Sequence, residues 1–240
     1  MGSHKDAENP QATLPTPVTP AGRAALEAIL ERPGRTVIAL DFDGTLAPIV
    51  PGLEHLVVLG HYGAERWDAV TDTVSAPAPH PGVAAVRAEL PAVLDGAGAG
   101  QGTWIEEKGR AVAVHTRRAT DPQAAFEALR APLADLAHRH GLIVEPGRLV
   151  LELRPPGMDK GVALRDHLTR TDAESVLYAG DDLGDLPAFA AVEKLRTEGT
   201  PGLLVCSGSA EVTELSERAD LVVDGPAGVV ALLAAIAEHV

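Results

Sequence analysis

Acidic side chains directly follow two apolar runs of this sequence. Asp41 and Asp43 come after the run 36–40, and Asp181 comes shortly after the run 176–178. The carboxyl ends of strands meet at one edge of an open α/β sheet, so we expect these carboxylates to converge. Carboxylate oxygens are ligands that Mg²⁺ prefers, and this ion usually also bridges to a substrate phosphate. The sequence therefore predicts a magnesium site for phosphate chemistry.

The residues around this site suggest a division of chemical roles. Asp41 can attack phosphorus and form an aspartyl phosphate, which splits hydrolysis into two easier steps. Asp43 can protonate the leaving oxygen and then activate water. Lys160, at the start of a predicted helix, would offset the charge of the nucleophile and the phosphoryl group. Gly44 lets the chain turn sharply, so we expect Gly44 and Thr45 to contact the phosphate.

The expected metal ligands are Asp41, Asp43 and Asp181, with Asp182 as a weaker ligand. Asp182 and Asp185 both lie in the segment G-D-D-L-G-D that begins at Gly180. One of the two would support the metal from outside its coordination sphere, and the other would cap the following helix. The sequence leaves open which residue does which.

Composition restricts the kind of partner. The 240 residues carry a formal net charge of -14 and are 45% apolar, which predicts a globular protein that binds neither nucleic acid nor an anionic membrane. We expect a monomer that acts on a small molecule. No apolar run is long enough to span a bilayer, and the lone Cys206 fits a reducing compartment, so we expect a cytoplasmic location.

The order of apolar runs and Pro- or Gly-rich breaks predicts the domain organisation. We expect a disordered leader over residues 1–21, a core over 22–78 and 157–240, and an insert over 79–156. Within the core, the run 36–40 predicts a buried central strand, and 56–59 predicts a second buried strand. Strands alternate with helices after residue 159, which favours a parallel sheet covered on both faces. The insert has the predicted order αββαββ.

Several motifs resemble those of a known family. The segment D-F-D-G-T at 41–45, the later Lys160 and the segment G-D-D-L-G-D are similar to the haloacid dehalogenase superfamily. More narrowly, the chain resembles trehalose-6-phosphate phosphatases over residues 35–240, in the segments G-H-Y-G-A-E-R at 60–66, I-E-E-K-G at 105–109, H-T-R at 115–117, L-E-L-R-P at 151–155 and D-K-G-V-A-L at 159–164. The resemblance implies a Rossmann-like α/β core with an α/β cap and Mg²⁺-dependent hydrolysis of trehalose 6-phosphate.

The same resemblance implies a set of sugar-binding residues in the insert, which would be a mobile cap. Glu106, Lys108 and Glu152 are the candidates, because carboxylates and an ammonium group can exchange several hydrogen bonds with a polyhydroxylated, uncharged disaccharide. His61 and His115 could also touch the substrate, although each could equally be a structural hydrogen-bonding residue.

One expected motif is absent from the sequence. The superfamily has a strand that ends in Ser or Thr, followed in this family by Gly-Arg, between the first motif and the loop at Gly60. Only Pro51 and Gly52 separate Val50 from Leu53, whereas a parallel crossover needs about a dozen residues. Either the natural protein has a segment that this sequence lacks, or the chain is a deletion variant with a damaged phosphate pocket.

Three functions therefore remain as hypotheses. The first is a phosphatase for trehalose 6-phosphate, and the second is a phosphatase for another sugar phosphate. The third is a catalytically impaired domain that binds a sugar phosphate without hydrolysing it, because the phosphate-binding hydroxyl is missing.

Overall fold

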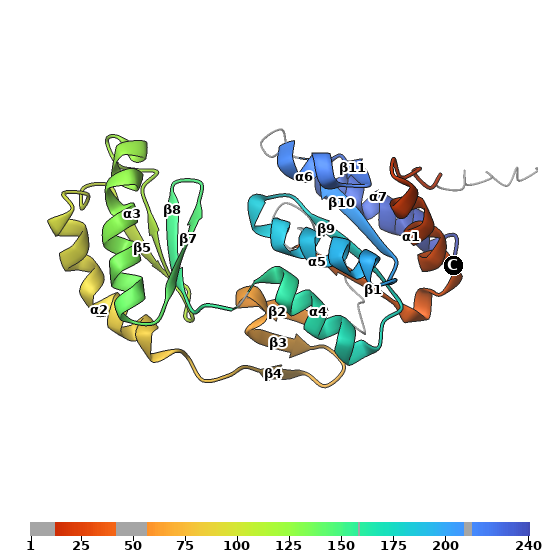
Figure 1. The fold of residues 1–240 in the computed structure, drawn as a ribbon, viewed down its shortest axis with the longest axis horizontal. Helices are drawn as coiled ribbons and strands as arrows, with labels where there is room; N and C mark the ends of the chain where they lie inside the picture. Colours follow the sequence, from red (N-terminus) through yellow and green to blue (C-terminus); the bar gives the residue numbers. More distant parts are fainter. Residues whose placement is uncertain (1–12, 42–56, 158, 209–212) are drawn as a thin grey trace, which may run out of the picture. The chain divides into compact units, whose positions relative to one another are not determined.

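The computed structural model describes residues 13–41, 57–157, 159–208 and 213–240, and the chain groups into two compact units. One unit consists of residues 1–52 and 160–240, and the other of residues 53–159 (Figure 1). Residues 53–78, which the sequence analysis assigned to the core, thus group with the second unit.

The first unit contains a parallel sheet with the strand order β1-β9-β10-β11. Its strands are β1 (Thr36–Leu40), β9 (Ser175–Gly180), β10 (Gly202–Ser207) and β11 (Leu221–Val223). The intervening and flanking helices are α1 (Pro20–Glu31), η1 (Pro33–Arg35), α4 (Lys160–Thr171), η3 (Leu183–Asp185), α5 (Leu186–Thr197), α6 (Thr213–Arg218) and α7 (Gly225–Ala237). The prediction of a parallel α/β sheet is confirmed.

Helices cover both faces of this sheet, as predicted. Apolar residues of α1 and α7 pack against Leu177, Leu203 and Val205 on one face. Residues of α4, α5 and α6 pack against Val176 and Leu204 on the other. Alternate residues of β9 and β10 thus enter two separate cores, which explains why these strands consist of continuous apolar runs.

Strand β1 lies at an edge of the described sheet, and the prediction of a buried central strand was wrong. Its only strand partner among the described residues is β9, and Ile38 is 43% exposed. A β-branched run indicates that a segment will form a strand, but it does not indicate whether one or two strands will pair with it.

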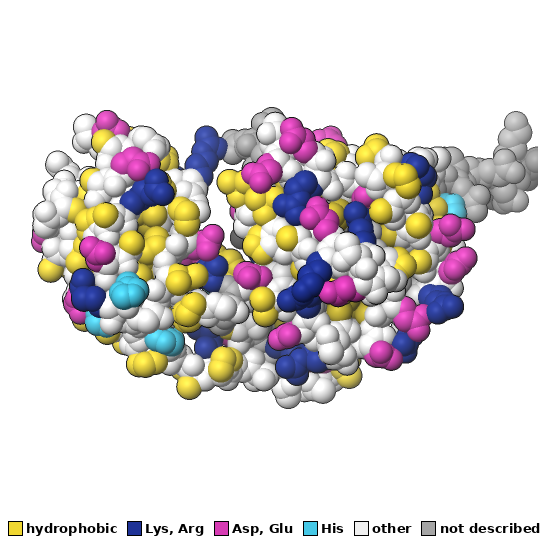
Figure 2. Space-filling view, viewed as in Figure 1, with side chains coloured by type: hydrophobic (Ala, Val, Ile, Leu, Met, Phe, Trp, Pro, Cys, Tyr) yellow, Lys and Arg dark blue, Asp and Glu magenta, His cyan; other side chains and the backbone are white. Residues whose placement is uncertain are grey.

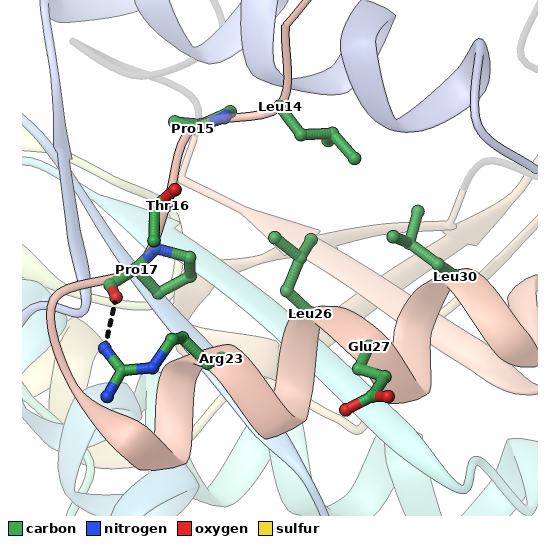
Figure 3. Close-up of a pocket in the computed structure, with 8 residues that line it drawn as sticks. All are labelled: Leu14, Pro15, Thr16, Pro17, Arg23, Leu26, Glu27 and Leu30. Carbon is green, nitrogen blue, oxygen red and sulfur yellow. Dashed lines mark hydrogen bonds between the residues drawn. The ribbon is translucent and has the colours of Figure 1, made fainter.

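The described end of the expected leader packs on the first unit, so the prediction of disorder does not hold for residues 13–21. Leu14 points toward α1, and Arg23 donates a 2.9 Å hydrogen bond to the carbonyl of Pro17 (Figure 3). The hydroxyl of Thr19 accepts from the backbone N–H of Gly22 at 2.9 Å and caps α1. The cap and these packing contacts fix a segment whose composition alone suggested a flexible chain.

The second unit contains a four-stranded antiparallel sheet in the order β5-β6-β8-β7. The helices α2 (Pro81–Gly96) and α3 (Pro122–Arg139) cover one of its faces, and the strands are β5 (Trp104–Glu107), β6 (Val112–His115), β7 (Ile143–Gly147) and β8 (Val150–Arg154) (Figure 1). The chain order α2-β5-β6-α3-β7-β8 is the predicted αββαββ. Val112 and Val114 of β6 and Leu151 and Leu153 of β8 enter the apolar core under the helices, and the residues between them face the other side of the sheet.

A smaller sheet in the second unit differs from the expectation for residues 56–59. Strands β2 (Val57–Gly60), β3 (Glu65–Asp68) and β4 (Thr73–Ser75) pair antiparallel, and the short helix η2 (His61–Gly63) joins the first two. Val58 is 46% exposed, so β2 is not the buried strand that its apolar sequence predicted. An apolar run of four residues does not reveal whether one or both faces of a strand are covered.

The surface carries charged side chains of both signs. Acidic and basic side chains are interspersed on the face shown in Figure 2. Within the described ranges, no helix combines the length and the apolar character needed to cross a bilayer.

Candidate active site

The predicted acidic residues meet at the carboxyl edge of the parallel sheet. Leu40 pairs with Ala179, and the backbone N–H of Asp41 continues the ladder by donating to the carbonyl of Ala179 at 2.9 Å. Asp41 and Asp181 therefore lie next to each other just beyond the carboxyl ends of β1 and β9. Carboxylate oxygens of Asp41, Asp181 and Asp185 lie within 4.8 Å of one another.

Lys160 joins two of these carboxylates. Its Nζ atom, at the first residue of α4, donates to Oδ1 of Asp41 and to Oδ1 of Asp185, both at 2.7 Å. Burial alone would lower the pKa of Lys160, but the charges of Asp185 and Asp41 outweigh it and raise the pKa above its ordinary value. The ammonium group therefore stays charged at neutral pH, and one of its N–H groups donates a hydrogen bond to Asp41, the predicted nucleophile.

Asp185 organises the site, although the sequence left its role undecided. It is completely buried, and its carboxylate accepts hydrogen bonds from Lys160, from the hydroxyl of Tyr178 at 2.6 Å, and from the backbone N–H groups of Asp181 and Asp182 at 2.9 and 3.2 Å. These bonds fix the turn that follows β9. Burial and the charge of Asp185 raise the pKa of Tyr178 well above its ordinary value, so its hydroxyl remains a donor.

Asp182 is exposed and serves the turn. Its Oδ1 accepts from the backbone N–H of Gly184 at 2.8 Å, and with Asp185 it forms a capping box at η3. Of the two residues that the sequence left undecided, Asp185 contacts Lys160, whereas the described hydrogen bond of the Asp182 side chain is to the turn itself. The cluster of carboxylates found among the described residues does not include Asp182.

The acidic cluster suits a small, hard cation. Lys160 pairs with Asp41 and Asp185, and the three carboxylates of the cluster offer only oxygen donors, which match the preference of Mg²⁺. Asp185 already accepts four hydrogen bonds, which favours Asp41 and Asp181 as direct ligands. Asp43, Gly44 and Thr45 lie outside the described residues, so their predicted roles stay predictions.

The three predicted sugar-binding residues occupy one face of the second unit's sheet. Glu106 pairs with Ala113 across β5 and β6, and Ala113 pairs with Glu152 across β6 and β8. The Nζ atom of Lys108 donates to Oε2 of Glu152 at 2.8 Å. Since all three lie on the face opposite to α2 and α3, they are brought together away from the apolar core.

The two histidines have different surroundings in this unit. His115 lies 2.6 Å from Oε2 of Glu106 through its Nε2 and stacks on Trp104, with ring centroids 4.4 Å apart. His61 lies 3.8 Å from the carboxylate of Glu65. His115 therefore belongs to the group around Glu106, whereas the described contact of His61 is with its own hairpin.

Comparison with known proteins identifies the family. The model of the family described as trehalose-phosphatase matches residues 65–221, which is more than half of the chain. The chain belongs to the trehalose-phosphatase family. The resemblance to trehalose-6-phosphate phosphatases seen in the motifs is thereby confirmed.

Individual relatives and a solved structure agree with this assignment. A trehalose-phosphate phosphatase from Mycolicibacterium paratuberculosis is 39% identical over 119 residues, which cover 46% of this chain and 29% of that protein. A probable trehalose-phosphate phosphatase from Sinorhizobium fredii is 32% identical over 142 residues, covering 58% and 51%. The C-terminal domain of a Candida albicans trehalose-6-phosphate phosphatase has a similar fold, with a TM-score of 0.65 at 18% identity over 94% of this chain and all of that one. The chain thus spans about half the length, or less, of these two curated relatives.

Gly180 offers a test of the turn that carries the acidic residues of this trehalose-phosphatase family member. A Cβ atom at Gly180 would lie 2.4 Å from the carboxylate of Asp185, so Gly180→Ala must displace Asp185 from its donors. We expect the free energy of unfolding to fall by about 1–3 kcal/mol, measured by urea denaturation. Gly34→Ala is the control, since a Cβ atom there meets nothing within 4 Å. Equal stability of the two variants would contradict the role given to Asp185.

Proposed function

We propose that this chain hydrolyses trehalose 6-phosphate to trehalose and inorganic phosphate, with Asp41 as the nucleophile. The observation that carries the proposal is the lysine bridge, in which Lys160 holds Asp41 and the buried Asp185 at 2.7 Å each. Its support comes from the family and from the convergence of acidic residues at the sheet edge.

The reaction would proceed in two displacements at phosphorus. A carboxylate oxygen of Asp41 forms a bond to phosphorus as the bond from phosphorus to the sugar oxygen breaks, and Asp43 gives its proton to that oxygen. Water then attacks the aspartyl phosphate, Asp43 takes a proton from the water, and the bond from phosphorus to Asp41 breaks. Trehalose, phosphate and the free Asp41 carboxylate result, so the enzyme returns to its starting state.

Asp41, Asp43 and Asp181 would hold Mg²⁺, and Lys160 would supply the fixed positive charge. When bound, Mg²⁺ offsets the negative charge of the phosphate so that a carboxylate can approach it. Lys160 keeps one carboxylate oxygen of Asp41 in place through its 2.7 Å bond. Because Asp185 is completely buried and accepts four hydrogen bonds, Lys160 has a rigid support on its other side.

Glu106, Lys108 and Glu152 would recognise the sugar. The ion pair of Lys108 with Glu152 raises the pKa of Lys108 against the opposing effect of its burial, so the group remains a donor of hydrogen bonds. Together the three residues offer donors and acceptors to an uncharged disaccharide. This proposal includes a small-molecule substrate, no nucleic-acid or membrane partner, a monomeric state and, on the single cysteine, a cytoplasmic location.

A sugar-phosphate-binding domain without turnover is the second candidate. The missing hydroxyl motif favours it, because in the superfamily that motif lies between the first motif and the loop at Gly60. This candidate predicts binding of the sugar phosphate without release of phosphate.

A phosphate-release assay on the full chain separates these candidates. We expect trehalose 6-phosphate to be hydrolysed in preference to glucose 6-phosphate, sucrose 6-phosphate and fructose 6-phosphate. Removal of Mg²⁺ with EDTA should abolish the release, and added Mg²⁺ should restore it, because ionised carboxylates in the cluster repel each other and the phosphate without the metal. Preference for another ester would favour the second sugar-phosphate hypothesis, and calorimetric binding without any turnover would favour the binding domain.

A further inference from the structure

Glu106 is the most exposed of the three residues proposed to recognise the sugar. Its side chain is 45% exposed, whereas that of Glu152 is 7% exposed. Glu152 is held by the Nζ atom of Lys108 at 2.8 Å and by the hydroxyl of Tyr62. Glu106 extends instead from β5, an edge strand of the described sheet. An exposed glutamate samples several rotamers, and fixing one of them on binding lowers affinity, so a partner that fixes the rotamer beforehand favours recognition.

His115 is such a partner for Glu106. It ends β6, directly opposite Trp104 of β5 and diagonal to Glu106, on the sheet face away from α2 and α3. Its Nε2 atom lies 2.6 Å from Oε2 of Glu106. Because an ionised carboxylate only accepts hydrogen bonds, Nε2 carries the hydrogen and is the donor. No hydrogen bond to Oε1 of Glu106 occurs among the described residues, so this second oxygen stays available as an acceptor.

An aromatic stack holds the imidazole ring of His115 in this orientation. The rings of Trp104 and His115 are almost parallel, with centroids 4.4 Å apart and an interplanar angle of 4°. The guanidinium carbon of Arg118 lies 4.6 Å from the centroid of the Trp104 ring, within the range of a cation–π contact. Since His115 occupies one face of the indole, Arg118 covers the other. The imidazole therefore cannot turn away from Glu106 without leaving the stack.

The second ring nitrogen of His115 indicates that packing alone does not explain a histidine here. Its Nδ1 atom is buried and has no hydrogen-bond partner within the described ranges. A buried polar atom without a partner lowers stability and calls for an explanation. A phenylalanine ring would stack on Trp104 without this disadvantage, but it would lack the Nε2 donor. The bond from Nε2 to Glu106 is therefore what a histidine adds at this position.

We infer that His115 is a positioning residue that fixes Glu106, so that Oε1 of Glu106 accepts a hydrogen bond from a sugar hydroxyl. The ligand group is neutral and hydroxylated, because an ionised carboxylate accepts from hydroxyls and repels anions. The sheet face then presents two carboxylates, Glu106 and Glu152, on either side of Ala113, and both are fixed before the ligand arrives. The part of this inference that concerns the sugar rests on the proposed function, whereas the fixed position of Glu106 does not.

Crystal structures of the unmodified chain and of His115→Phe test the positioning directly. The variant keeps an aromatic ring against Trp104 and removes the donor. We expect the carboxylate of Glu106 to leave its single position and to occupy other rotamers. His115→Leu, which also lacks a donor, serves if the phenylalanine variant does not fold. Glu106 in one unchanged rotamer in the folded variant would overturn the inference.

Kinetics with trehalose 6-phosphate test the consequence for the substrate. His115→Phe should raise KM about three- to tenfold with a much smaller change in kcat, because the ordering of one side chain is then paid on binding. His115→Gln places an amide N–H close to the position of Nε2 and should retain most of the affinity. A KM of His115→Phe equal to that of the unmodified chain would contradict the inference.

His140→Phe is the matched control. His140 makes the same kind of bond, with Nε2 2.7 Å from Oε1 of Glu89, and its side chain is similarly half-buried. It follows α3, on the other face of the same sheet, so its loss should leave KM and kcat unaltered. An equal rise of KM in both variants would show a general effect on the fold and would count against positioning.

A double-variant cycle tests whether His115 acts through Glu106. Glu106→Ala removes the carboxylate, so adding His115→Phe should change KM less than twofold further, since nothing remains to be positioned. If His115 supports the site by another route, the two fold-changes in KM will multiply in the double variant, and this result would overturn the inference.

The two proposals can fail separately. A chain that releases no phosphate from any sugar ester overturns the proposed function, while the rotamer of Glu106 in the crystal structures still decides the role of His115. Conversely, an active enzyme in which His115→Phe leaves KM unchanged keeps the proposed function intact and overturns this inference.

Discussion

Replacing Asp41 with Asn is expected to reduce kcat for phosphate release by on the order of 10³-fold or more, because an amide does not displace the sugar oxygen from phosphorus. The fold should survive, since Lys160 keeps its second partner, Asp185, at 2.7 Å. Phosphate release under saturating trehalose 6-phosphate measures the first effect, and circular dichroism on heating measures the second.

The matched control for this variant is Asp172→Asn. Asp172 has an 88% exposed side chain and pairs with Arg35 at the surface, so its loss should change the free energy of unfolding by less than about 0.5 kcal/mol and leave kcat unaltered. If Asp41→Asn keeps a tenth or more of the normal turnover, Asp41 is not the nucleophile.

Replacing Asp185 with Asn is expected to reduce both activity and stability. The neutral amide keeps the shape but removes the charge that pairs with Lys160, and its NH₂ group faces donors such as the hydroxyl of Tyr178. Breaking a buried ion pair typically costs about 3–5 kcal/mol, and Lys160 retains Asp41, so we expect a loss of about 2 kcal/mol in urea unfolding. We expect kcat to fall about 10²-fold because Asp41 loses its fixed neighbour.

A second buried aspartate separates the catalytic effect from the structural one. Asp220 is also completely buried, accepts from the backbone N–H of Leu204 at 2.8 Å and pairs with Arg196. It lies just before β11, at the opposite edge of the parallel sheet from Asp41. Asp220→Asn should therefore destabilise the chain while kcat stays close to normal, and an equal loss of kcat in both variants would argue against a special role for Asp185.

The sequence was most informative about the parallel sheet and the residues that follow its strands. Continuous apolar runs predicted β1 and β9, and parallel strands bring their carboxyl ends to one edge. The convergence of Asp41 and Asp181 follows from this rule alone. Lys160 could be predicted as a partner because the family motif placed it there, but its bridging position depends on Asp185.

The role of Asp185 could not be read from the sequence because it depends on contacts made after folding. Asp182 and Asp185 are equally acidic and equally near the strand, and only burial and the donors from Tyr178 and the backbone distinguish them. Gly180, the first residue of the motif, is the position where a side chain would collide with Asp185. This close approach is visible only in the structure, because the sequence does not show that Asp185 folds back onto Gly180.

The sequence also did not predict which segments lie beside each strand, or the conformation of the surface turn at Tyr62. The edge position of β1 and the exposed face of β2 depend on which segments lie beside them, and a local pattern does not contain that information. Tyr62 was likewise overlooked, because its contact with Arg154 joins residues 92 positions apart and rests on a left-handed turn without glycine. Neither feature has a local sequence signature.

Trapping the phosphoryl group on the protein tests the central claim most directly. The unmodified chain is mixed with Mg²⁺ and trehalose 6-phosphate carrying labelled phosphate, quenched in acid during turnover, and digested for peptide mapping. We predict label on the peptide that contains Asp41, removable by hydroxylamine as expected for an acyl phosphate, and none in the Asp41→Asn variant. Label on a different residue, or labelled peptide in Asp41→Asn at the level of the unmodified chain, would contradict the account.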